Sequence, residues 1–191
     1  MADTEETETE EVTEPDVEET STDEAEADDE IEIVEEQLYG VPVRNAFGQT
    51  VLFPDVDGYF DLLGELHSDG FAQVIDLCGV DYLLHERSDL PASVIPERFE
   101  VVINLISHAR RERIRVRVQV PEGGSVMSAF DLFPGTEAME REAFDMFGIA
   151  FDEHPDLSRI LMPETWEGYP LRKDFDTGQI PVQFKDAPGP R

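Results

Sequence analysis

Residues 111–120 read Arg-Glu-Arg-Ile-Arg-Val-Arg-Val-Gln-Val, and this stretch decides the fold class. Apolar and polar residues alternate along it, which is the two-residue period of a β-strand with one buried face. The alternation places the branched side chains on one face, namely Ile114, Val116, Val118 and Val120. It places four arginines on the other, which form the arginine face: Arg111, Arg113, Arg115 and Arg117.

The preceding residues predict a second strand beside the first. Phe99–Ile106 is apolar at alternate positions, and Val102 and Ile106 make its other face partly apolar as well. A strand of this kind is usually covered on both faces. Because only residues 107–110 connect the two strands, we expect them to form an antiparallel pair.

The remaining elements follow from helical and strand periods on either side of this pair. Apolar residues at helical spacing predict a helix over 57–69 and a second over 137–147, where Gly148 follows as a stop. Residues 71–84 predict a strand with a break near Gly79. Together they predict an α+β fold in which helices pack on an antiparallel or mixed sheet.

The composition divides the chain into three parts. Residues 1–36 hold 19 acidic residues with no Lys, Arg or aromatic residue, which predicts a disordered acidic tail. Residues 37–155 form the α+β domain. Residues 156–191 are rich in proline and predict an extended C-terminal arm, whose apolar side chains lie on another surface.

Charge argues against several classes of function. The 191 residues carry 45 acidic and 14 basic side chains, a net charge of −31, which repels nucleic acid and anionic membranes. No apolar run approaches the roughly 18 residues that span a bilayer. The N-terminus has no basic and apolar signal segment, so we expect a chain made and kept in the cytosol.

The sequence offers few candidates for chemistry. One cysteine, Cys78, excludes an internal disulfide and cysteine-based zinc or iron–sulfur sites, and its apolar neighbours predict a buried side chain. His67, His85 and His108 have no partner at ligand spacing. The sequence contains no phosphate-binding glycine loop and no nucleophile paired with a base, so we expect no catalysis by this chain.

The arginine face admits three interpretations. It can dock a carboxylate-rich partner or a phosphate, because guanidinium groups pair with both in bidentate geometry. It can be a solvated sheet face that keeps the protein soluble, which we favour. It can also attract the acidic tail in a salt-dependent way.

Residues Asp152-Glu-His154-Pro-Asp156 bring two carboxylates and an imidazole close together. This composition suits a metal or an acid–base pair. However, the spacing matches no helix-borne ligand motif, and Pro155 excludes a helix interior. We therefore favour a turn in which His154 or Asp156 bonds the backbone.

A dense series of motifs runs through the C-terminal third. It reads Glu140-Arg-Glu-Ala-Phe-Asp145-Met-Phe-Gly148-Ile149, His154-Pro-Asp-Leu157, Arg159-Ile-Leu-Met-Pro163, Trp166-Glu-Gly168 and Pro170-Leu-Arg-Lys-Asp174. In this order it resembles the C subunit of NADH-quinone oxidoreductase, the smaller hydrophilic subunit of respiratory complex I. The resemblance is dense over 137–175 and weaker over 57–120. Departures are few: Glu153 replaces a common glycine, Ser158 a basic residue, Tyr169 a histidine, and Phe144 and Phe175 tyrosines.

The resemblance implies a structural, non-catalytic subunit of the peripheral arm. That complex passes electrons from NADH through FMN and iron–sulfur clusters to quinone and pumps protons. The family's C-terminal stretch wraps neighbouring subunits, chiefly the D subunit and also the B and I subunits, on the cytoplasmic side of the cell membrane. Family members carry no flavin or cluster, and other subunits form the quinone pocket.

The resemblance therefore implies no catalytic, cofactor-binding or metal-binding residue in this chain. It marks a set of motif residues as contacts with other subunits: Glu140, Arg141, Glu142, Asp145, Gly148, His154, Pro155, Arg159, Trp166, Gly168, Arg172, Lys173 and Asp174. Within the helix, Arg141 and Asp145 are four residues apart, so we expect them to pair. We expect Trp166 to anchor the arm.

Two other identities remain open at this point. One is the related subunit of a membrane-bound hydrogenase or of an F420H2-type dehydrogenase. The other is a free-standing hydrolase that uses Asp145, His154 and Asp156.

Overall fold

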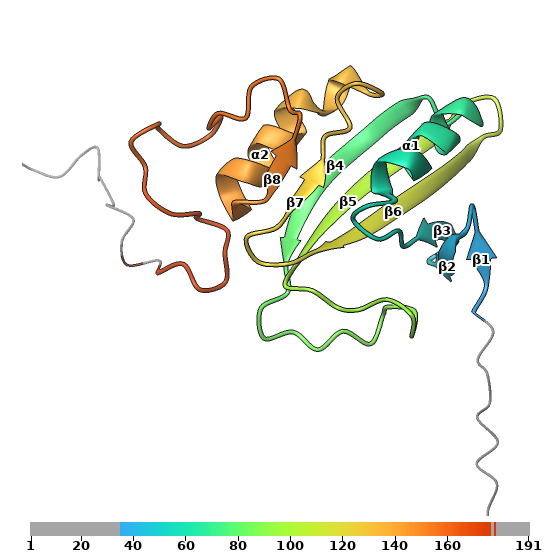
Figure 1. The fold of residues 1–191 in the computed structure, drawn as a ribbon, viewed down its shortest axis with the longest axis horizontal. Coiled ribbons are helices and arrows are strands. Elements are labelled where there is room, and N and C mark those ends of the chain that lie inside the picture. The colour runs from blue at the N-terminus through green and yellow to red at the C-terminus, as the bar shows by residue number, and fades with distance from the viewer. Residues whose placement is uncertain (1–34, 177, 179–191) are drawn as a thin grey trace, which may run out of the picture. The chain divides into compact units, whose positions relative to one another are not determined.

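The computed structural model describes residues 35–176 and residue 178, and it is an α+β fold (Figure 1). Its elements in chain order are β1 (Gln37–Leu38), β2 (Val41–Ala46), β3 (Gln49–Leu52), α1 (Tyr59–Ser68), β4 (Gln73–Asp81), β5 (Phe99–Ser107), β6 (Glu112–Val120), β7 (Ser125–Met127), the 3-10 turn η1 (Pro134–Thr136), α2 (Glu137–Phe147) and β8 (Ala150–Asp152). The helix predicted over 137–147 has those bounds, and the one predicted over 57–69 is two residues shorter at its start and one shorter at its end.

The described strands form a mixed sheet of six, in the order β1-β2-β3-β6-β5-β4. β3 and β6 run parallel, and every other neighbouring pair is antiparallel. β7 and β8 form a separate parallel pair. The predicted α+β class and mixed sheet are therefore confirmed.

β5 and β6 are the antiparallel pair that the alternation predicted, with Phe99 opposite Val120 and Ser107 opposite Glu112. The apolar residues of β6 are buried as expected. Arg111 is an exception to the predicted arginine face, because it lies in the connecting turn with a backbone φ of +57°. A strand residue cannot adopt this angle, so β6 begins one residue later.

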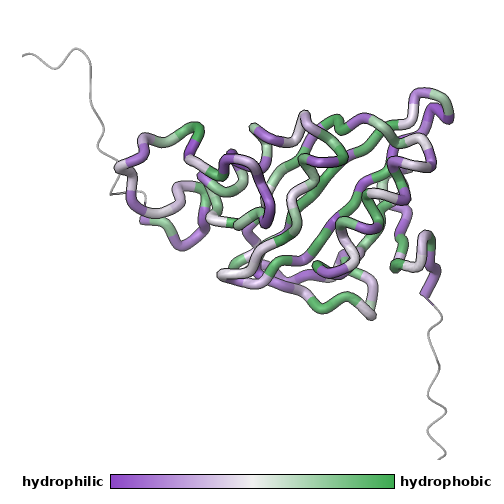
Figure 2. Tube along the Cα trace, turned by 45° about the horizontal axis from the view of Figure 1, so that its top comes forward, coloured by the Kyte–Doolittle hydropathy of each residue, from purple (hydrophilic) through white to green (hydrophobic). Residues whose placement is uncertain are grey.

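Both helices bury their apolar residues with one face of the sheet in a single core. α1 contributes Tyr59, Leu62, Leu63 and Leu66, each of which is at most 3% exposed to solvent. α2 contributes Ala143 and packs partly buried Met139 and Phe147 against the same core. In Figure 2, hydrophobic segments run along the strands of the sheet.

Two predictions about β4 are wrong. The strand is continuous through Gly79, and its irregularity is a bulge between Val74 and Asp76. Gly79 instead permits close packing, since a Cβ there would lie 2.9 Å from the Phe147 ring and 3.1 Å from Ile149. Cys78 is exposed rather than buried, because its neighbour Leu77 is the residue that faces the core.

The second face of the sheet is partly covered by the loop over residues 82–98. A small core of Val51, Phe53 and Leu90 lies between this loop and the sheet. Beside it, Glu100 is fully buried and accepts hydrogen bonds from the Arg87 and Arg117 guanidiniums at 2.7 and 2.8 Å. The preferred interpretation of a solvated arginine face is therefore wrong for Arg117, which the buried carboxylate holds.

The first described residues are bonded to the loop over residues 82–98 and to β2. Glu35 accepts hydrogen bonds from the backbone of Ala92 and Ser93, and the Glu36 carbonyl accepts one from Val43 N–H at 3.0 Å. Residues 156–176 contain neither helix nor strand. Most of the predicted acidic tail and the last residues of the arm lie outside the described residues, and the proposed division at residues 36 and 155 stays a prediction.

Candidate functional site

The motif residues gather around α2 and the loop that follows β8. Figure 1 shows this loop, residues 153–176, continuing from β8 past the end of α2. Gly148 ends the helix in the left-handed conformation with φ +74°, and its N–H donates to the Phe144 carbonyl. We use the name motif cluster for the motif residues between Glu140 and Asp174, which lie on α2 and on this loop.

Asp145 is the centre of the motif cluster. Its carboxylate is fully buried and accepts three backbone N–H bonds, from Ile160 at 3.0 Å and from Leu161 and Met162 at 2.8 Å. The Arg159 guanidinium donates a fourth at 2.6 Å. Burial alone would raise the pKa of Asp145, but these bonds hold it below the usual value. The carboxylate is thus an acceptor for the loop backbone through Oδ2 and for the Arg159 guanidinium through Oδ1.

The predicted pair of Arg141 with Asp145 is wrong. The Arg141 guanidinium donates to the Ser158 carbonyl at 3.1 Å and to the Ser158 hydroxyl at 2.9 Å, and it also reaches the Arg159 carbonyl. Asp145 is instead paired with Arg159, fourteen residues further along the chain. The helical spacing permits a pair between Arg141 and Asp145. The loop offers each of them more bonds, because its carbonyls accept from Arg141 and its amides donate to Asp145, whereas a single ion pair on a helix surface contributes little.

Glu140 is also fully buried, on the side of α2 nearest the end of β7. It accepts hydrogen bonds from the Ser128 hydroxyl at 2.5 Å and from Ala129 N–H at 2.8 Å. Burial raises the pKa of Glu140, and the bonds from Ser128 and Ala129 offset part of that effect. Glu140 therefore fixes the chain where it leaves β7.

His154 lies in a turn, in agreement with the favoured interpretation of residues 152–156. Its Nε2 is 3.1 Å from the Glu137 carbonyl, and its Nδ1 accepts from Asp156 N–H at 3.1 Å. Both ring nitrogens of His154 therefore lie at hydrogen-bond distance from backbone groups. The ring is shielded from solvent and lies 3.9 Å from the Glu140 carboxylate, so His154 and Asp145 serve different parts of the cluster.

The C-terminal arm is bonded to α2 and β4 as far as Asp174. Leu171 N–H donates to the Met146 carbonyl at 3.1 Å, and the Arg172 guanidinium donates to the Phe147 carbonyl at 2.6 Å. Lys173 N–H donates to the Asp81 carboxylate at 2.8 Å, and Asp174 pairs with Arg98 at 2.7 Å. Three successive motif residues therefore fasten the arm.

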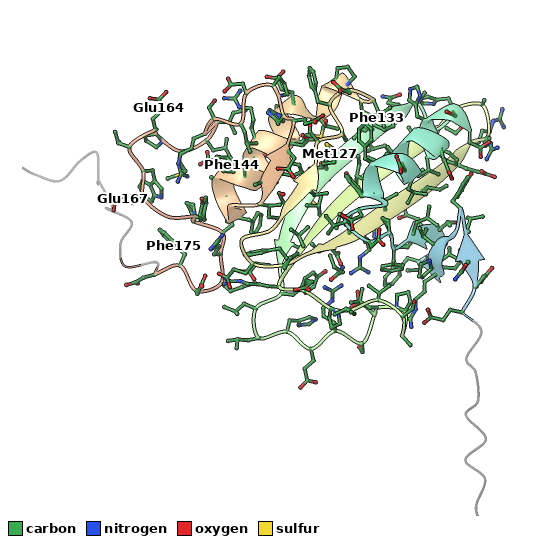
Figure 3. All side chains as sticks on the ribbon, in the orientation of Figure 1. Met127, Phe133, Phe144, Glu164, Glu167 and Phe175 are labelled. Atoms are coloured by element: carbon green, nitrogen blue, oxygen red, sulfur yellow. The ribbon has the colours of Figure 1, made fainter. Side chains whose placement is uncertain are left out.

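The remaining motif residues are more exposed. Trp166 is half-buried, stacks on Phe175 with ring centroids 6.5 Å apart, and has no acceptor for its Nε1–H among the described residues. Glu164 and Glu167 point outward from the same loop in Figure 3. The Gly168 carbonyl accepts from Arg159, whereas Glu142 and Pro155 are exposed. The roles of these residues in contacts with other subunits stay predictions.

Sequence reasoning missed the residues that receive the arm and the buried network under the second sheet face. Asp81 and Arg98 lie far from the arm in sequence, and Glu100 occupies a position where alternation allows any polar residue. One signal was available for Asp81: it lies within residues 57–120, over which the family resemblance is weaker. Spacing alone cannot pair residues more than 70 positions apart.

Within 35–176 and 178, no three His, Cys, Asp or Glu side chains are grouped as metal ligands. None of the helices in this part of the chain has the length and apolar character needed to cross a membrane.

Replacing Gly148 with alanine is expected to destabilise the motif cluster. The left-handed backbone alone costs about 1–2 kcal/mol for a residue with a Cβ. The added Cβ would also lie 2.6 Å from the Tyr169 ring and 2.7 Å from the Arg172 guanidinium, so the arm must shift. Thermal unfolding measures the sum of these two effects.

Gly40→Ala is the matched control for this prediction. Gly40 has nearly the same φ, +73°, but nothing lies within 4 Å of the Cβ position. Equal losses of stability in the two variants would show that contact between Gly148 and the arm contributes nothing.

Comparison with known proteins identifies the family. Residues 55–180 match the family model described as the 30 Kd subunit of respiratory-chain NADH dehydrogenase. The C subunit of NADH-quinone oxidoreductase from Phenylobacterium zucineum is 43% identical over 143 residues, which cover 74% of this chain and 64% of the relative. The same subunit of Hyphomonas neptunium is 46% identical over 143 residues, covering 73% and 66%. The chain thus spans just under two thirds of the length of these relatives.

Solved structures share the fold. A trypsin-resistant fragment of Nqo5 is 31% identical, with a TM-score of 0.55, and covers 62% of this chain and 90% of the fragment. A chain of the archaeal membrane-bound sulfane sulfur reductase has the same TM-score at 20% identity, which is evidence for the fold alone. Because the family model spans residues 55–180, which include β4, β5, β6 and the whole motif cluster, the chain belongs to the 30 kDa subunit family of respiratory-chain NADH dehydrogenase.

Proposed function

We propose that this chain is a non-catalytic structural subunit in the peripheral arm of a proton-translocating NADH-quinone oxidoreductase. The observation that carries the proposal is the use of the motif residues as structural bonds. Asp145 forms more hydrogen bonds than the other motif residues: its Oδ2 accepts three loop amides, and its Oδ1 accepts the Arg159 guanidinium. Its role in this proposal is to hold the C-terminal loop in one conformation, ready for a partner.

The proposed partners are the other subunits of the complex, chiefly the D subunit and also the B and I subunits. In this proposal FMN and the iron–sulfur clusters belong to partner subunits, and electrons pass from NADH to quinone without entering this chain. The chain supports assembly of the quinone-reducing module on the cytoplasmic side of the cell membrane. Family membership and the fastened arm support this placement.

The hydrolase alternative has little support from the geometry. Such an enzyme would need Asp145 and His154 to act on one substrate. However, Asp145 is bonded to residues 159–162, whereas His154 is bonded to Glu137 and Asp156. A subunit of a hydrogenase or F420H2-type dehydrogenase remains a related alternative, which the electron donor of the purified complex distinguishes.

Replacing Arg141 with alanine is expected to lower the amount of assembled complex. The change removes three hydrogen bonds that hold the carbonyls and hydroxyl of residues 158–159 to α2. Each bond to a charged group contributes about 1.5–3 kcal/mol, so residues 158–159 lose their attachment to Arg141, whereas the bonds from residues 159–162 to Asp145 remain. Native gel electrophoresis of membranes measures the assembled complex, and an unchanged amount would contradict the proposed role of the loop.

Purification of the affinity-tagged full chain in mild detergent at low salt tests the proposed function itself. We expect it to bring down a complex that contains flavin and iron–sulfur clusters and oxidises NADH with a quinone acceptor. A chain that purifies alone with a bound divalent metal would contradict the proposal and favour the hydrolase.

A further inference from the structure

The turn between β2 and β3 presents an aromatic side chain directly to solvent. Phe47 is completely exposed, at 103% relative accessibility, and has a backbone φ of +53°. Gly48 follows with φ +74°, so both central residues of the two-residue hairpin turn are left-handed. Asparagine or glycine suits the first of these positions, whereas a bulky side chain there is strained. The phenylalanine thus benefits neither the turn nor the core.

A cavity of about 650 Å³ opens beside this turn. The β5–β6 turn reaches the same end of the sheet, because β3 and β6 run parallel and both start there. Arginine side chains from this turn and the start of β6 line the cavity, namely Arg110, Arg111 and Arg113, together with Phe47 and Phe71. We term this region the basic end of the sheet.

Among the residues that the structure describes, two of these arginines have no carboxylate partner. Arg110 pairs with Asp69 at 2.7 Å, but Arg111 and Arg113 form no ion pair within the described residues. Acidic residues outnumber basic ones 45 to 14 in this chain, so acids are available in excess. Arg87, Arg117 and Arg159 are each held by carboxylates, whereas these two guanidiniums stay exposed.

We propose that the basic end of the sheet docks an acidic segment of another subunit. Carboxylates of that segment pair with Arg111 and Arg113, and an apolar pocket of the partner covers the Phe47 ring. Guanidinium groups bind carboxylates in bidentate geometry, and buried aromatic residues at interfaces supply much of the binding energy. This inference rests on the proposed function, because it takes the partner to be a subunit of the same complex.

A protein segment fits this site better than a lipid surface. The basic end borders a partly open cavity of about 650 Å³, into which a chain segment can insert, whereas the surface of a bilayer is flat. A membrane and the chain's own N-terminal residues are outcomes that the following test distinguishes.

Photocrosslinking from position 47 in the purified intact complex tests the proposal. Phe47 is replaced with p-benzoylphenylalanine, the complex is irradiated, and the crosslinked peptides are identified by mass spectrometry. We expect a crosslink to a peptide of another subunit that is rich in Asp and Glu. Crosslinks only to lipid, only to residues 1–34 of the same chain, or to no partner within an intact complex would overturn the proposal.

Charge reversal supplies the second arm of the test. Arg111→Glu with Arg113→Glu is expected to lower the crosslink yield about tenfold, since like charges oppose each other at the contact. Arg111→Lys with Arg113→Lys keeps the charge and is expected to retain most of the yield. Because both side chains are exposed, the melting temperature of the isolated chain should change little.

The two proposals fail in different ways. If the tagged chain purifies with the complex but the crosslink yield is unchanged by charge reversal, the docking surface is wrong and the structural role stands. If the chain purifies without any other subunit, the proposed function is wrong and the docking proposal is overturned with it.

Discussion

Replacing Glu100 with alanine is expected to lower the free energy of unfolding by about 3–5 kcal/mol, the usual cost of breaking a buried ion pair. Its side chain is fully buried and accepts hydrogen bonds from Arg87 at 2.7 Å and from Arg117 at 2.8 and 3.0 Å. Gln119 bonds the same carboxylate. Without Glu100, the two guanidiniums share only the half-exposed carboxylate of Asp89.

Urea unfolding of the isolated chain measures this loss, with Glu122→Ala as the control. Glu122 also pairs with an arginine, Arg98 at 2.7 Å, but its side chain is 57% exposed. An exposed pair contributes at most about 1 kcal/mol. We also expect faster hydrogen exchange over the loop 82–98 in Glu100→Ala, because this network holds the loop on the sheet. A loss no larger than that of Glu122→Ala would contradict the network's role.

Asp145→Ala is expected to have a comparable effect, about 3–5 kcal/mol, because it leaves the Arg159 guanidinium and three loop amides without their buried acceptor. The loss should be concentrated in the C-terminal loop. Limited proteolysis after residue 159 measures its release, and thermal unfolding measures the total. Glu142→Gln is the control on the same helix, since Glu142 is exposed and forms no bond within the described residues.

The Asp145 contribution has a defined dependence on pH. The pKa of this carboxyl is lower in the folded chain than in the unfolded one, so its stabilising effect is complete above the unfolded value of about 3.9. Stability is lost as the pH falls from there through the folded pKa. We therefore expect the difference between wild type and Asp145→Ala to shrink on acidification below that value. A difference that is constant with pH would contradict the charged role of Asp145.

The centre of the fold could be predicted from sequence because its periods are strict. Alternation over residues 99–120 predicted the antiparallel pair β5–β6, and helical spacing with Gly148 predicted α2 with its bounds. Both patterns arise because one face of the strand or helix is buried, so that apolar residues recur at the spacing of that element. The break at Gly79 was wrong for a related reason: glycine usually weakens a strand, but here it admits the Phe147 ring.

The sequence was sufficient to identify the residues of the motif cluster, but it did not predict which of them form hydrogen bonds with one another. The residues from Glu140 to Asp174 were recognised as one unit through the family resemblance, whereas the pair of Arg141 with Asp145 was assigned from helical spacing. The structure gives each of them a partner in the loop instead. A helix spacing rule compares side chains only, and it cannot weigh backbone amides and carbonyls that a distant loop brings to the same place.

The central claim is that the polar motif residues build and position this subunit rather than catalyse. It is tested by NADH:quinone turnover per assembled complex in membranes that carry His154→Gln or Arg141→Ala. Quinone-reductase activity is divided by the amount of intact complex on a native gel. We expect less complex in the Arg141→Ala membranes, but turnover per complex within about twofold of wild type in both variants, since a residue that only holds the fold leaves the reacting groups of an assembled complex unchanged. Normal assembly with turnover per complex reduced about a hundredfold, the scale of a lost general acid or base, would contradict the account.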